Sequence, residues 1–454
     1  MTPLNYESLT SAISGSAAAF RLTLRLEAVS PKVFPPTYEG GKYATEERII
    51  GGVKLPCVLL DSVASQANRM ELALQEAWEG SELELPVMTV DFSTSTSKEA
   101  DKYLKGIKIS SLQAPHRIAD AILRDSTHDG TKFPKSEIGI ALDKQIRLGD
   151  ATPLLKFAPH CLVFGMWYST GERGGLGVKF QRAMVSEIIG ISAVPGISTS
   201  SRIDPLNIQK LVDKEDEAGV TIYRAKSGGW TLKKEDAEKK GDKYVLYGKK
   251  GKPSEINHGN IKPALVFQKD NGKVVLGTAE RPVMMVVINN DNEGGHKYVL
   301  QDERKPIPVG GFTIDYAEQT TVLSLPALRR LRFPIKAGDK STPDGDNAAR
   351  AYLAALGLLG ATLAVDAGYD LRSRCILRAT NAVTWQLLGK PGDADISLTL
   401  DKAGAIKLYN DALAAVKKAK LPIHLEEVIL TPSDDLVTLV KKSMELAAVE
   451  TGGE

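Results

Sequence analysis

The chain has 454 residues, of which 43% are hydrophobic and 25% are charged. That is enough for two or three ordinary globular domains, or for one elaborated domain with insertions. The formal net charge is only +2, which excludes a uniformly basic coat for nucleic acid. Any RNA binding must therefore come from local clusters of positive charge.

The three cysteines lie far apart, and the six histidines show no metal-ligand spacing. We therefore expect no disulfide framework, no metal site and no cofactor. The N-terminal residues lack the basic region and long apolar core of a signal peptide, so we expect a cytoplasmic protein without a membrane partner.

The first predicted strand covers residues 20–27, where hydrophobic and polar residues alternate without interruption. A period of two indicates a half-buried strand of an antiparallel sheet. A loop rich in Gly and Lys then leads to a second apolar strand, Val53 to Leu60. This strand ends in Asp61-Ser62 and opens directly into a helix.

The helix after Ser62 has two distinct faces. Ser62, Ser65 and Arg69 project together, with Gln66 on their flank, beside a helix start that offers free N–H groups and a partial positive charge. We predict a phosphate-binding site there. The neighbouring Gly- and Lys-bearing loop indicates that the ligand contains several phosphates in a row. The alternative is an ordinary capped amphipathic helix with Arg69 in solvent. The opposite, buried stripe is predicted to contain Val63, Ala67, Met70, Leu74, Ala77 and Trp78.

The glycine-rich run 171–177 does not have the spacing of a nucleotide-binding loop. We predict a flexible turn that allows close approach to an RNA backbone, followed by a helix that carries Lys179 and Arg182. The elements expected in this part of the chain are a strand at 87–92, a helix at 114–126, a polar insertion at 126–153, a strand at 162–167, the turn at 169–177 and a helix at 180–191.

Composition changes after residue 192. Residues 224–252 contain ten Lys or Arg and four acidic residues, a local balance of +6. Most such runs are solvated faces. Strand character returns at 310–325, and residues 348–367 predict a buried core helix. Mixed strands and helices without βαβ spacing favour an α+β domain with an antiparallel sheet.

Five segments together resemble those of a known family: Gly-Gly-Val-Lys at 51–54, S-Q-A-N-R-M-E at 65–71, A-P-H-R-I-A-D-A-I-L-R-D-S at 114–126, L-V-F-G-M at 162–166 and S-R-I-D-P-L at 201–206. They resemble the RNA-binding backbone subunit, the "Cas seven" family, of type I CRISPR Cascade surveillance complexes. Their sequences are closest to the type I-G branch, formerly I-U. The resemblance covers most of the chain and is loose beyond about residue 372.

The resemblance implies an RRM-like (ferredoxin-like) antiparallel palm with inserted finger and thumb segments. Residues 1–191 would form the first part of the palm, with a finger-like insertion at about 93–160. Residues 192–305 would form a basic, thumb-like insertion, and residues 306–454 would complete the palm and add C-terminal helices.

The implied function is that of a non-catalytic subunit that binds CRISPR RNA along its sugar-phosphate backbone. Several copies would line up along one RNA and leave its bases exposed to pair with target DNA. Other copies of the chain, a large subunit and an RNA-processing subunit would be its partners. If the 224–252 run is functional, we expect it to contact target DNA or a partner subunit rather than the guide.

The residues expected to bind RNA form two groups. Physical reasoning and the resemblance together select Lys54, Ser65, Gln66, Asn68 and Arg69; position in the chain adds Lys42, Lys179, Arg182 and Arg202. Many relatives have Lys-Arg where this chain has Asn68-Arg69. Tyr38 and Tyr43 flank Lys42. Such a mixture of aromatic and basic residues suits the binding of single-stranded nucleic acid.

Two other functions remain open at this point. One is a metal-dependent ribonuclease that uses Glu39, Glu46 or Glu47 to cut RNA paired with the guide. The other is a protein-interaction module without RNA, in which the 224–252 run binds an acidic partner.

Overall fold

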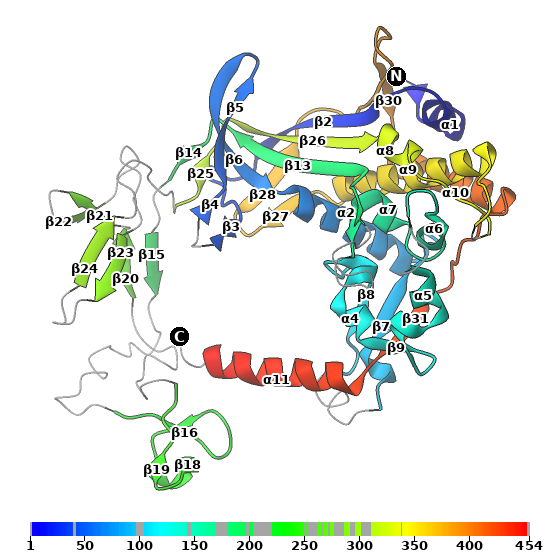
Figure 1. Ribbon diagram of the computed structural model, residues 1–454. Helices are drawn as coiled ribbons and strands as arrows, with labels where there is room; N and C mark the ends of the chain where they lie inside the picture. Colours follow the sequence, from blue (N-terminus) through cyan, green and yellow to red (C-terminus); the bar gives the residue numbers. More distant parts are fainter. Residues whose placement is uncertain are drawn as a thin grey trace. The chain divides into compact units, whose positions relative to one another are not determined.

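A computed structural model describes most of the chain. It divides into two compact units, Met1–Val194 with Phe312–Val437, and Pro195–Gly311 with Thr438–Glu454. The first unit mixes helices with a large sheet, which confirms the predicted α+β class (Figure 1). The described residues are 2–39, 42–96, 104–142, 147–168, 179–196, 199–202, 220–248, 251, 261–265, 267–270, 273–276, 286–290, 296–300, 310–336 and 338–451.

The large sheet of the first unit has ten strands. Eight of them lie in the order β1-β30-β29-β2-β26-β13-β6-β5, and the β27–β28 hairpin pairs with β2. Their bounds are β1 (Thr2–Pro3), β2 (Ala19–Ala28), β5 (Thr45–Ile50), β6 (Val53–Asp61), β13 (Met184–Ile191), β26 (Tyr316–Ser324), β27 (Tyr369–Arg372), β28 (Cys375–Ala379), β29 (Trp385–Leu388) and β30 (Ile396–Thr399).

Two helices connect the central strands and lie against the same face of the sheet. Helix α2 (Val63–Glu79) lies between β2 and β13 in the chain, and helix α9 (Pro343–Asp366) lies between β26 and β29. The spatial order β29-β2-β26-β13 with these two crossovers is a βαββαβ arrangement. It is compatible with the RRM-like palm that the resemblance implies.

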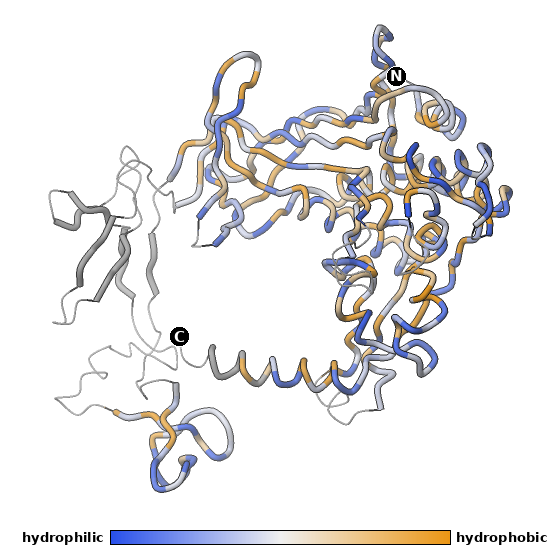
Figure 2. The backbone as a smooth tube through the Cα atoms, viewed as in Figure 1, coloured by the Kyte–Doolittle hydropathy of each residue, from blue (hydrophilic) through white to orange (hydrophobic). Residues whose placement is uncertain are grey.

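The core lies between this sheet and the helices. As predicted, β2 alternates: Leu22, Leu24 and Leu26 are fully buried, while the residues between them are exposed. Figure 2 shows the same alternation of hydrophobic and hydrophilic residues along the strands. The predicted strand Val53–Leu60 and the later strand β26 also form.

Helix α9 is the predicted core helix. It is long and apolar enough to cross a membrane, yet 89% of its most apolar window is buried inside the fold. Small residues permit this close packing. A Cβ at Gly360 would lie 3.2 Å from Leu74 of α2 and 3.4 Å from Phe164, so a larger residue would push these neighbours apart.

Two predicted elements of the first unit are wrong. Residues 162–167 were expected as a strand, but they belong mostly to helix α7 (His160–Phe164), with β11 (Met166–Trp167) after it. Residues 180–191 were expected as a helix, but they supply the end of β12 (Lys179–Phe180) and the central strand β13. Short, fully buried apolar runs carry no periodicity that separates strand from helix.

The predicted helix at 114–126 is broken. Only the 3₁₀ turn η3 (Arg117–Ala119) and the short helix α4 (Ala121–Arg124) form. Arg117 has a left-handed φ of 55°. Its guanidinium donates to Glu71 at 2.6 and 2.7 Å and to the carbonyl of Gly165 at 3.0 Å. This buried ion pair holds Arg117 in a conformation that a continuous helix does not allow.

A second, five-stranded sheet also belongs to the first unit. Its order is β10-β9-β31-β7-β8, so the predicted finger-like residues share a sheet with a strand near the C-terminus. The strands are β7 (Met88–Asp91), β8 (Lys108–Ser110), β9 (Ser126–His128), β10 (Thr131–Lys132) and β31 (Val428–Pro432). The other helices of the first unit are α1 (Tyr6–Ser14), α5 (Glu137–Ile140), α6 (Thr152–Phe157), α8 (Leu325–Arg329) and α10 (Lys402–Lys418).

The second unit consists of short strand pairs and most of helix α11 (Asp434–Thr451). The chain leaves the first unit at β14 (Val194–Pro195) and returns at β25 (Phe312–Thr313), and these two strands pair. The other described strands between them are β15 (Thr199–Arg202), β16 (Tyr223–Arg224), β17 (Trp230–Thr231), β18 (Lys239–Lys240), β19 (Lys243–Tyr244), β20 (Ile261–Leu265), β21 (Phe267–Asp270), β22 (Lys273–Leu276), β23 (Val286–Asn290) and β24 (His296–Leu300).

The fully buried His160 makes stability depend on pH. Burial and the nearby charge of Arg117 lower the pKa of His160 from 6.5 to about 3. Between these pH values the unfolded chain takes up a proton that the folded chain excludes. We therefore expect stability to fall as pH decreases from 6.5 toward 3, by up to about 1.4 kcal/mol per pH unit.

The variant His160→Leu removes this titration. The free energy of unfolding, measured by chemical denaturation at a series of pH values, should fall less steeply in the variant than in the parent chain. Identical slopes in the two proteins would contradict the assigned protonation state.

Candidate nucleic-acid interface

The predicted junction between β6 and α2 forms as expected. Ser62 caps the helix, and its hydroxyl accepts the backbone N–H of Ser65 at 3.3 Å. The predicted apolar stripe faces the interior. Its buried members are Ala67, Met70, Leu74 and Ala77, and Val63 and Trp78 at its ends are half-buried.

Asp61 organises the junction, although no pattern in the sequence singled it out. Its carboxylate is completely buried and has four side-chain donors. Oδ1 accepts Ser65 Oγ at 2.8 Å and Arg372 Nη2 at 3.2 Å. Oδ2 accepts Gln66 Nε2 at 2.7 Å and Arg69 Nε at 2.9 Å. These bonds offset the cost of placing the charge away from water.

The two arginines of this network are only partly buried. The side chains of Arg69 and Arg372 remain 32% and 27% exposed, whereas Asp61 is at 0%. Each guanidinium also donates to a backbone carbonyl: Arg69 to Leu371 at 2.6 Å and Arg372 to Leu60 at 2.7 Å. Two cations share one carboxylate, so the network carries one excess positive charge at the edge of the fold. We call Asp61, Arg69 and Arg372 the arginine network.

Gln66 points inward, away from a ligand on the surface. Its Oε1 accepts Ser186 Oγ at 2.9 Å and Gln319 Nε2 at 2.8 Å. The hydroxyl of Tyr369 in turn donates to Gln319 at 2.7 Å. This chain of hydrogen bonds joins α2 to strands β13, β26 and β27. Gln66 therefore has a structural role in the fold, and of the predicted polar residues of α2 only Asn68 is exposed.

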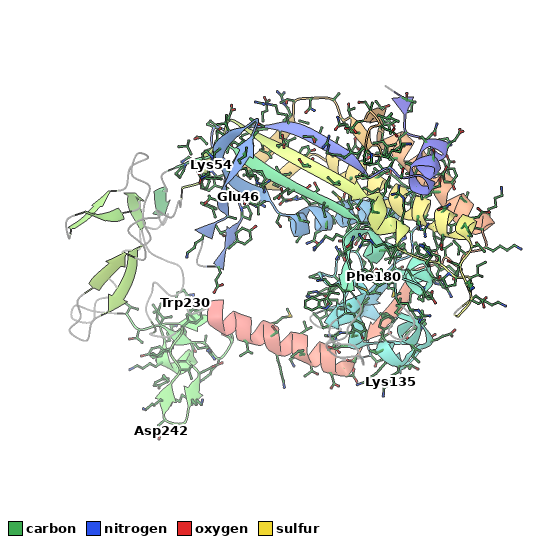
Figure 3. All side chains as sticks on the ribbon, turned by 45° about the horizontal axis from the view of Figure 1, so that its top comes forward. Glu46, Lys54, Lys135, Phe180, Trp230 and Asp242 are labelled. Carbon is green, nitrogen blue, oxygen red and sulfur yellow. The ribbon has the colours of Figure 1, made fainter. Side chains whose placement is uncertain are left out.

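Lys54 lies away from the helix start. Gly51 and Gly52 have φ values of 57° and 82°, which a two-residue hairpin turn requires, and they reverse the chain from β5 into β6. Lys54 is exposed beside this turn and pairs with Glu47 at 2.5 Å (Figure 3). Lys54 and Asp61 are seven positions apart along the strand, roughly 23 Å at ~3.3 Å per residue. Lys54 and the start of α2 are therefore two separate positions, and they do not form the single phosphate-binding site that was predicted.

The loop before β5 forms a small hairpin, β3 (Thr37–Tyr38) with β4 (Lys42–Tyr43). Lys42 and Tyr38 are exposed on it. Tyr43 packs edge-on against Phe312, with ring centroids 5.4 Å apart. The hairpin therefore presents one aromatic and one cationic side chain, and its second tyrosine is structural.

Lys179 and Arg182 lie beside an exposed tryptophan that sequence reasoning did not select. Trp167 and Lys179 are directly paired on β11 and β12, and the lysine Nζ lies 5.7 Å from the tryptophan ring centroid. Trp167 is 65% exposed. Arg182 is exposed just after β12. We call Trp167, Lys179 and Arg182 the tryptophan ribbon.

The tryptophan ribbon is anchored to α2. Arg117 contacts both Glu71 of α2 and the carbonyl of Gly165, which immediately precedes β11. Burial raises the pKa of Glu71, and the bidentate guanidinium opposes that shift. Helix α2 therefore supports both the arginine network and the tryptophan ribbon.

The remaining predicted positions are only partly described. Arg202 ends strand β15, and its side chain lies outside the described residues, as does the glycine run 171–177. Of the acidic residues considered for catalysis, Glu46 pairs with Arg48 and Glu47 with Lys54. Within the described residues, no three His, Cys, Asp or Glu side chains gather to hold a metal ion.

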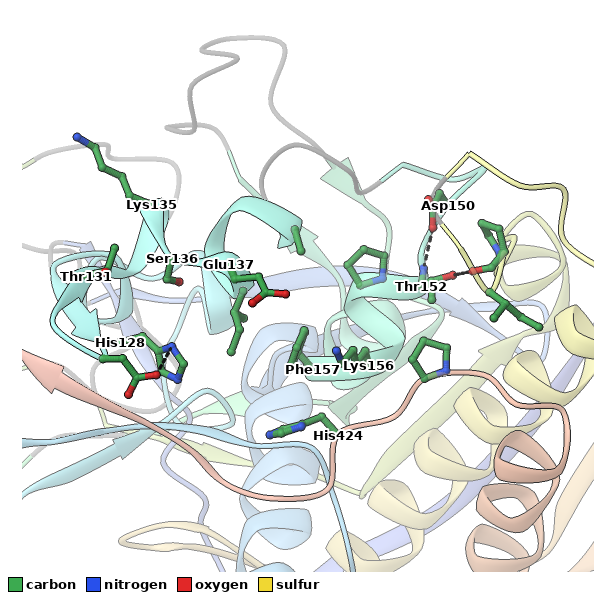
Figure 4. Close-up of a pocket in the computed structure, with 17 residues that line it drawn as sticks. His128, Thr131, Lys135, Ser136, Glu137, Asp150, Thr152, Lys156, Phe157 and His424 are labelled. Atoms are coloured by element: carbon green, nitrogen blue, oxygen red, sulfur yellow. Dashed lines mark hydrogen bonds and ion pairs between the residues drawn. The ribbon is translucent and has the colours of Figure 1, made fainter.

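A pocket of about 610 Å³ lies elsewhere in the first unit. Figure 4 shows that its walls come from the finger-like residues and the segment after α10. Phe157 and His424 meet there, with ring centroids 5.4 Å apart. Both acidic and basic residues line it, so its charge favours neither an anion nor a cation.

A comparison with known protein families gives a match that ends at a boundary of the fold. Residues 22–195 match the family model described as "CRISPR-associated protein GSU0053". The match supports a CRISPR-associated protein. It covers somewhat under two-fifths of the chain and ends where the first unit's N-terminal stretch ends, at Val194. None of the curated proteins matches the chain.

We expect Asp61→Ala to be strongly destabilising. The change leaves Arg69 and Arg372 without their shared carboxylate and removes the acceptor of Gln66. Breaking a buried ion pair by removing one partner costs about 3–5 kcal/mol. Chemical denaturation measures the loss.

Glu47→Ala is the matched control, because it removes an exposed carboxylate from the pair with Lys54. Such surface pairs contribute about 0–1 kcal/mol. Equal losses in the two variants would show that Asp61 does not organise the junction.

Proposed function

We propose that this protein is a non-catalytic backbone subunit of a type I-G Cascade complex. It binds CRISPR RNA along the sugar-phosphate backbone, and several copies assemble along one RNA. Together they present the guide for pairing with target DNA, alongside a large subunit and an RNA-processing subunit in the cytoplasm. The observation that carries the proposal is the match of residues 22–195 to a CRISPR-associated family model.

The matched segment contains the features suited to a single strand. It includes most of β2, the β3–β4 hairpin, the arginine network's Asp61 and Arg69, and the whole tryptophan ribbon. Guide sequences vary while the protein does not, so contacts must go mainly to phosphate and sugar. Partly exposed guanidiniums held by a buried carboxylate are preorganised for such contacts.

The face of the sheet opposite α2 and α9 adds further polar groups. Arg25 projects from β2, and its guanidinium lies 3.7 Å from the ring centroid of Tyr316 on β26. Arg21 on the same strand donates to Gln386 at 2.8 Å. This face thus combines cationic and aromatic side chains, the combination that single-stranded nucleic acid requires.

The tryptophan ribbon supplies the sharpest test of RNA binding. The double variant Lys179→Glu/Arg182→Glu changes two exposed cations and no buried contact of the arginine network. With guide RNA of fixed length, fluorescence anisotropy should show weaker binding and a shallower dependence on salt. For single strands, each lost phosphate contact reduces the slope of log K against log salt by about 0.7.

The double variant Lys418→Glu/Lys420→Glu is the charge-matched control, since both lysines are exposed, at the end of α10 and just after it, outside the matched segment. It should leave affinity and salt slope within error of the parent chain. A similar loss in both variants would indicate nonspecific charge effects. Failure of the parent chain to retain RNA after co-expression with a CRISPR array would contradict the proposed function itself.

The ribonuclease alternative makes a separate prediction. We expect the RNA-loaded protein to leave RNA complementary to the guide intact in the presence of Mg²⁺, as judged on denaturing gels. Cleavage that disappears in Glu39→Gln, Glu46→Gln or Glu47→Gln would favour the nuclease instead.

A further inference from the structure

The second unit contains a small folded lobe made of residues 220–248, which we call the basic lobe. It comprises β16 to β19 and the 3₁₀ turn η8 (Lys234–Asp236). Backbone hydrogen bonds tie its segments together: Glu238 N donates to Arg224 O at 2.8 Å, and Tyr247 N donates to Ile222 O at 2.9 Å. The lobe is therefore a defined structure and not simply a charged loop.

A few side chains form the interior of the basic lobe. Ile222, Ala225 and Ala237 are buried. Tyr223 packs on Tyr244 with ring centroids 5.7 Å apart. The remaining aromatic residue on the lobe's strands, Trp230, lies outside this cluster.

Trp230 is 45% exposed. It begins β17 directly after the Gly228–Gly229 turn, whose φ values are 92° and 74°. Trp230 is the direct cross-strand partner of Arg224. Opposite residues of an antiparallel pair project from the same face, so an indole and a guanidinium stand side by side. Arg224 lies 3.9 Å from the carboxylate of Glu238. The side chains of Arg224 and Glu238 are each over two-fifths exposed.

The charge of the basic lobe is unlike that of the rest of the chain. Residues 220–248 contain seven Lys or Arg and four Asp or Glu, a balance of +3, whereas all 454 residues together carry +2. The remainder is therefore slightly acidic. Figure 3 shows Trp230 and Asp242 at two ends of the lobe.

We propose that the basic lobe is a second binding site for single-stranded nucleic acid, separate from the guide-binding surface. Trp230 stacks on an unpaired base, and Arg224 with the surrounding lysines neutralises the adjoining phosphates. Stacking requires a base face that a duplex keeps covered, so the site prefers a single strand. Positive charge alone would bind duplex and single strand alike. The exposed indole is thus what makes the site selective.

The test uses the full chain, freed of nucleic acid in high salt and carrying Lys179→Glu/Arg182→Glu to weaken guide binding. Fluorescence anisotropy compares oligothymidine, oligouridine and duplex DNA of equal length. Adding Trp230→Ala should weaken binding of the single strands about 5- to 150-fold, the effect of losing one stacked base. Leu232→Ala is the matched control, because Leu232 is also exposed and has no ring.

Trp230→Phe guards against misfolding, since it keeps a ring and should retain most of the affinity. The tighter of the two single strands tells whether DNA or RNA is the natural ligand. Unchanged single-strand binding in Trp230→Ala, or an equal loss for duplex DNA, would overturn the proposal. If the chain with an unaltered lobe binds none of the three nucleic acids, the proposal is also overturned, and an acidic protein partner is favoured.

Retention of co-expressed guide RNA, measured in the otherwise unaltered chain, separates this proposal from the proposed function. Trp230→Ala should retain as much guide RNA as the parent. Loss of guide RNA in that variant would mean that the lobe belongs to the guide site. Absence of guide RNA from the parent chain would contradict the proposed function and leave the anisotropy test of the lobe unaffected.

Discussion

The completely buried carboxylate of Asp61 is the interaction on which the candidate interface depends. It joins the end of β6 and the first turns of α2 to the end of β27, which lies more than 300 residues away in the chain. A charge in this position persists only because four side chains donate to it. Its consequence is that Arg69 and Arg372 are held rigidly at the surface. Rigid cations lose little conformational freedom when they meet a phosphate.

Much of the fold could be predicted where the sequence carries a clear period or cap. The alternation of β2, the step from β6 through Ser62 into α2, and the apolar helix α9 all form. Prediction failed at residues 162–167 and 180–191, where apolar runs suit either a helix or a strand and contacts with distant parts of the fold decide between the two. The helix predicted at 114–126 is broken at Arg117. The partner of Arg117, Glu71, is 46 residues away in the chain, so the local pattern could not reveal the break.

The candidate site shows the same limit. Ser65, Gln66 and Arg69 could be selected from helical spacing, but their shared acceptor and the second guanidinium come from other elements. The spacing also did not reveal that Gln66 points into a buried network and that Lys54 stands at the far end of its strand. Trp167 had a usable signal, namely a tryptophan at the edge of a glycine-rich turn. Its exposure and its pairing with Lys179 became visible only in the fold.

The central claim is that copies of this chain assemble on one RNA through contacts to its backbone. Native mass spectrometry of the complex co-expressed with CRISPR arrays of different guide length measures this most directly. The account predicts one RNA per particle and a whole number of copies that rises with guide length. A single copy without RNA, or a copy number independent of guide length, would contradict it.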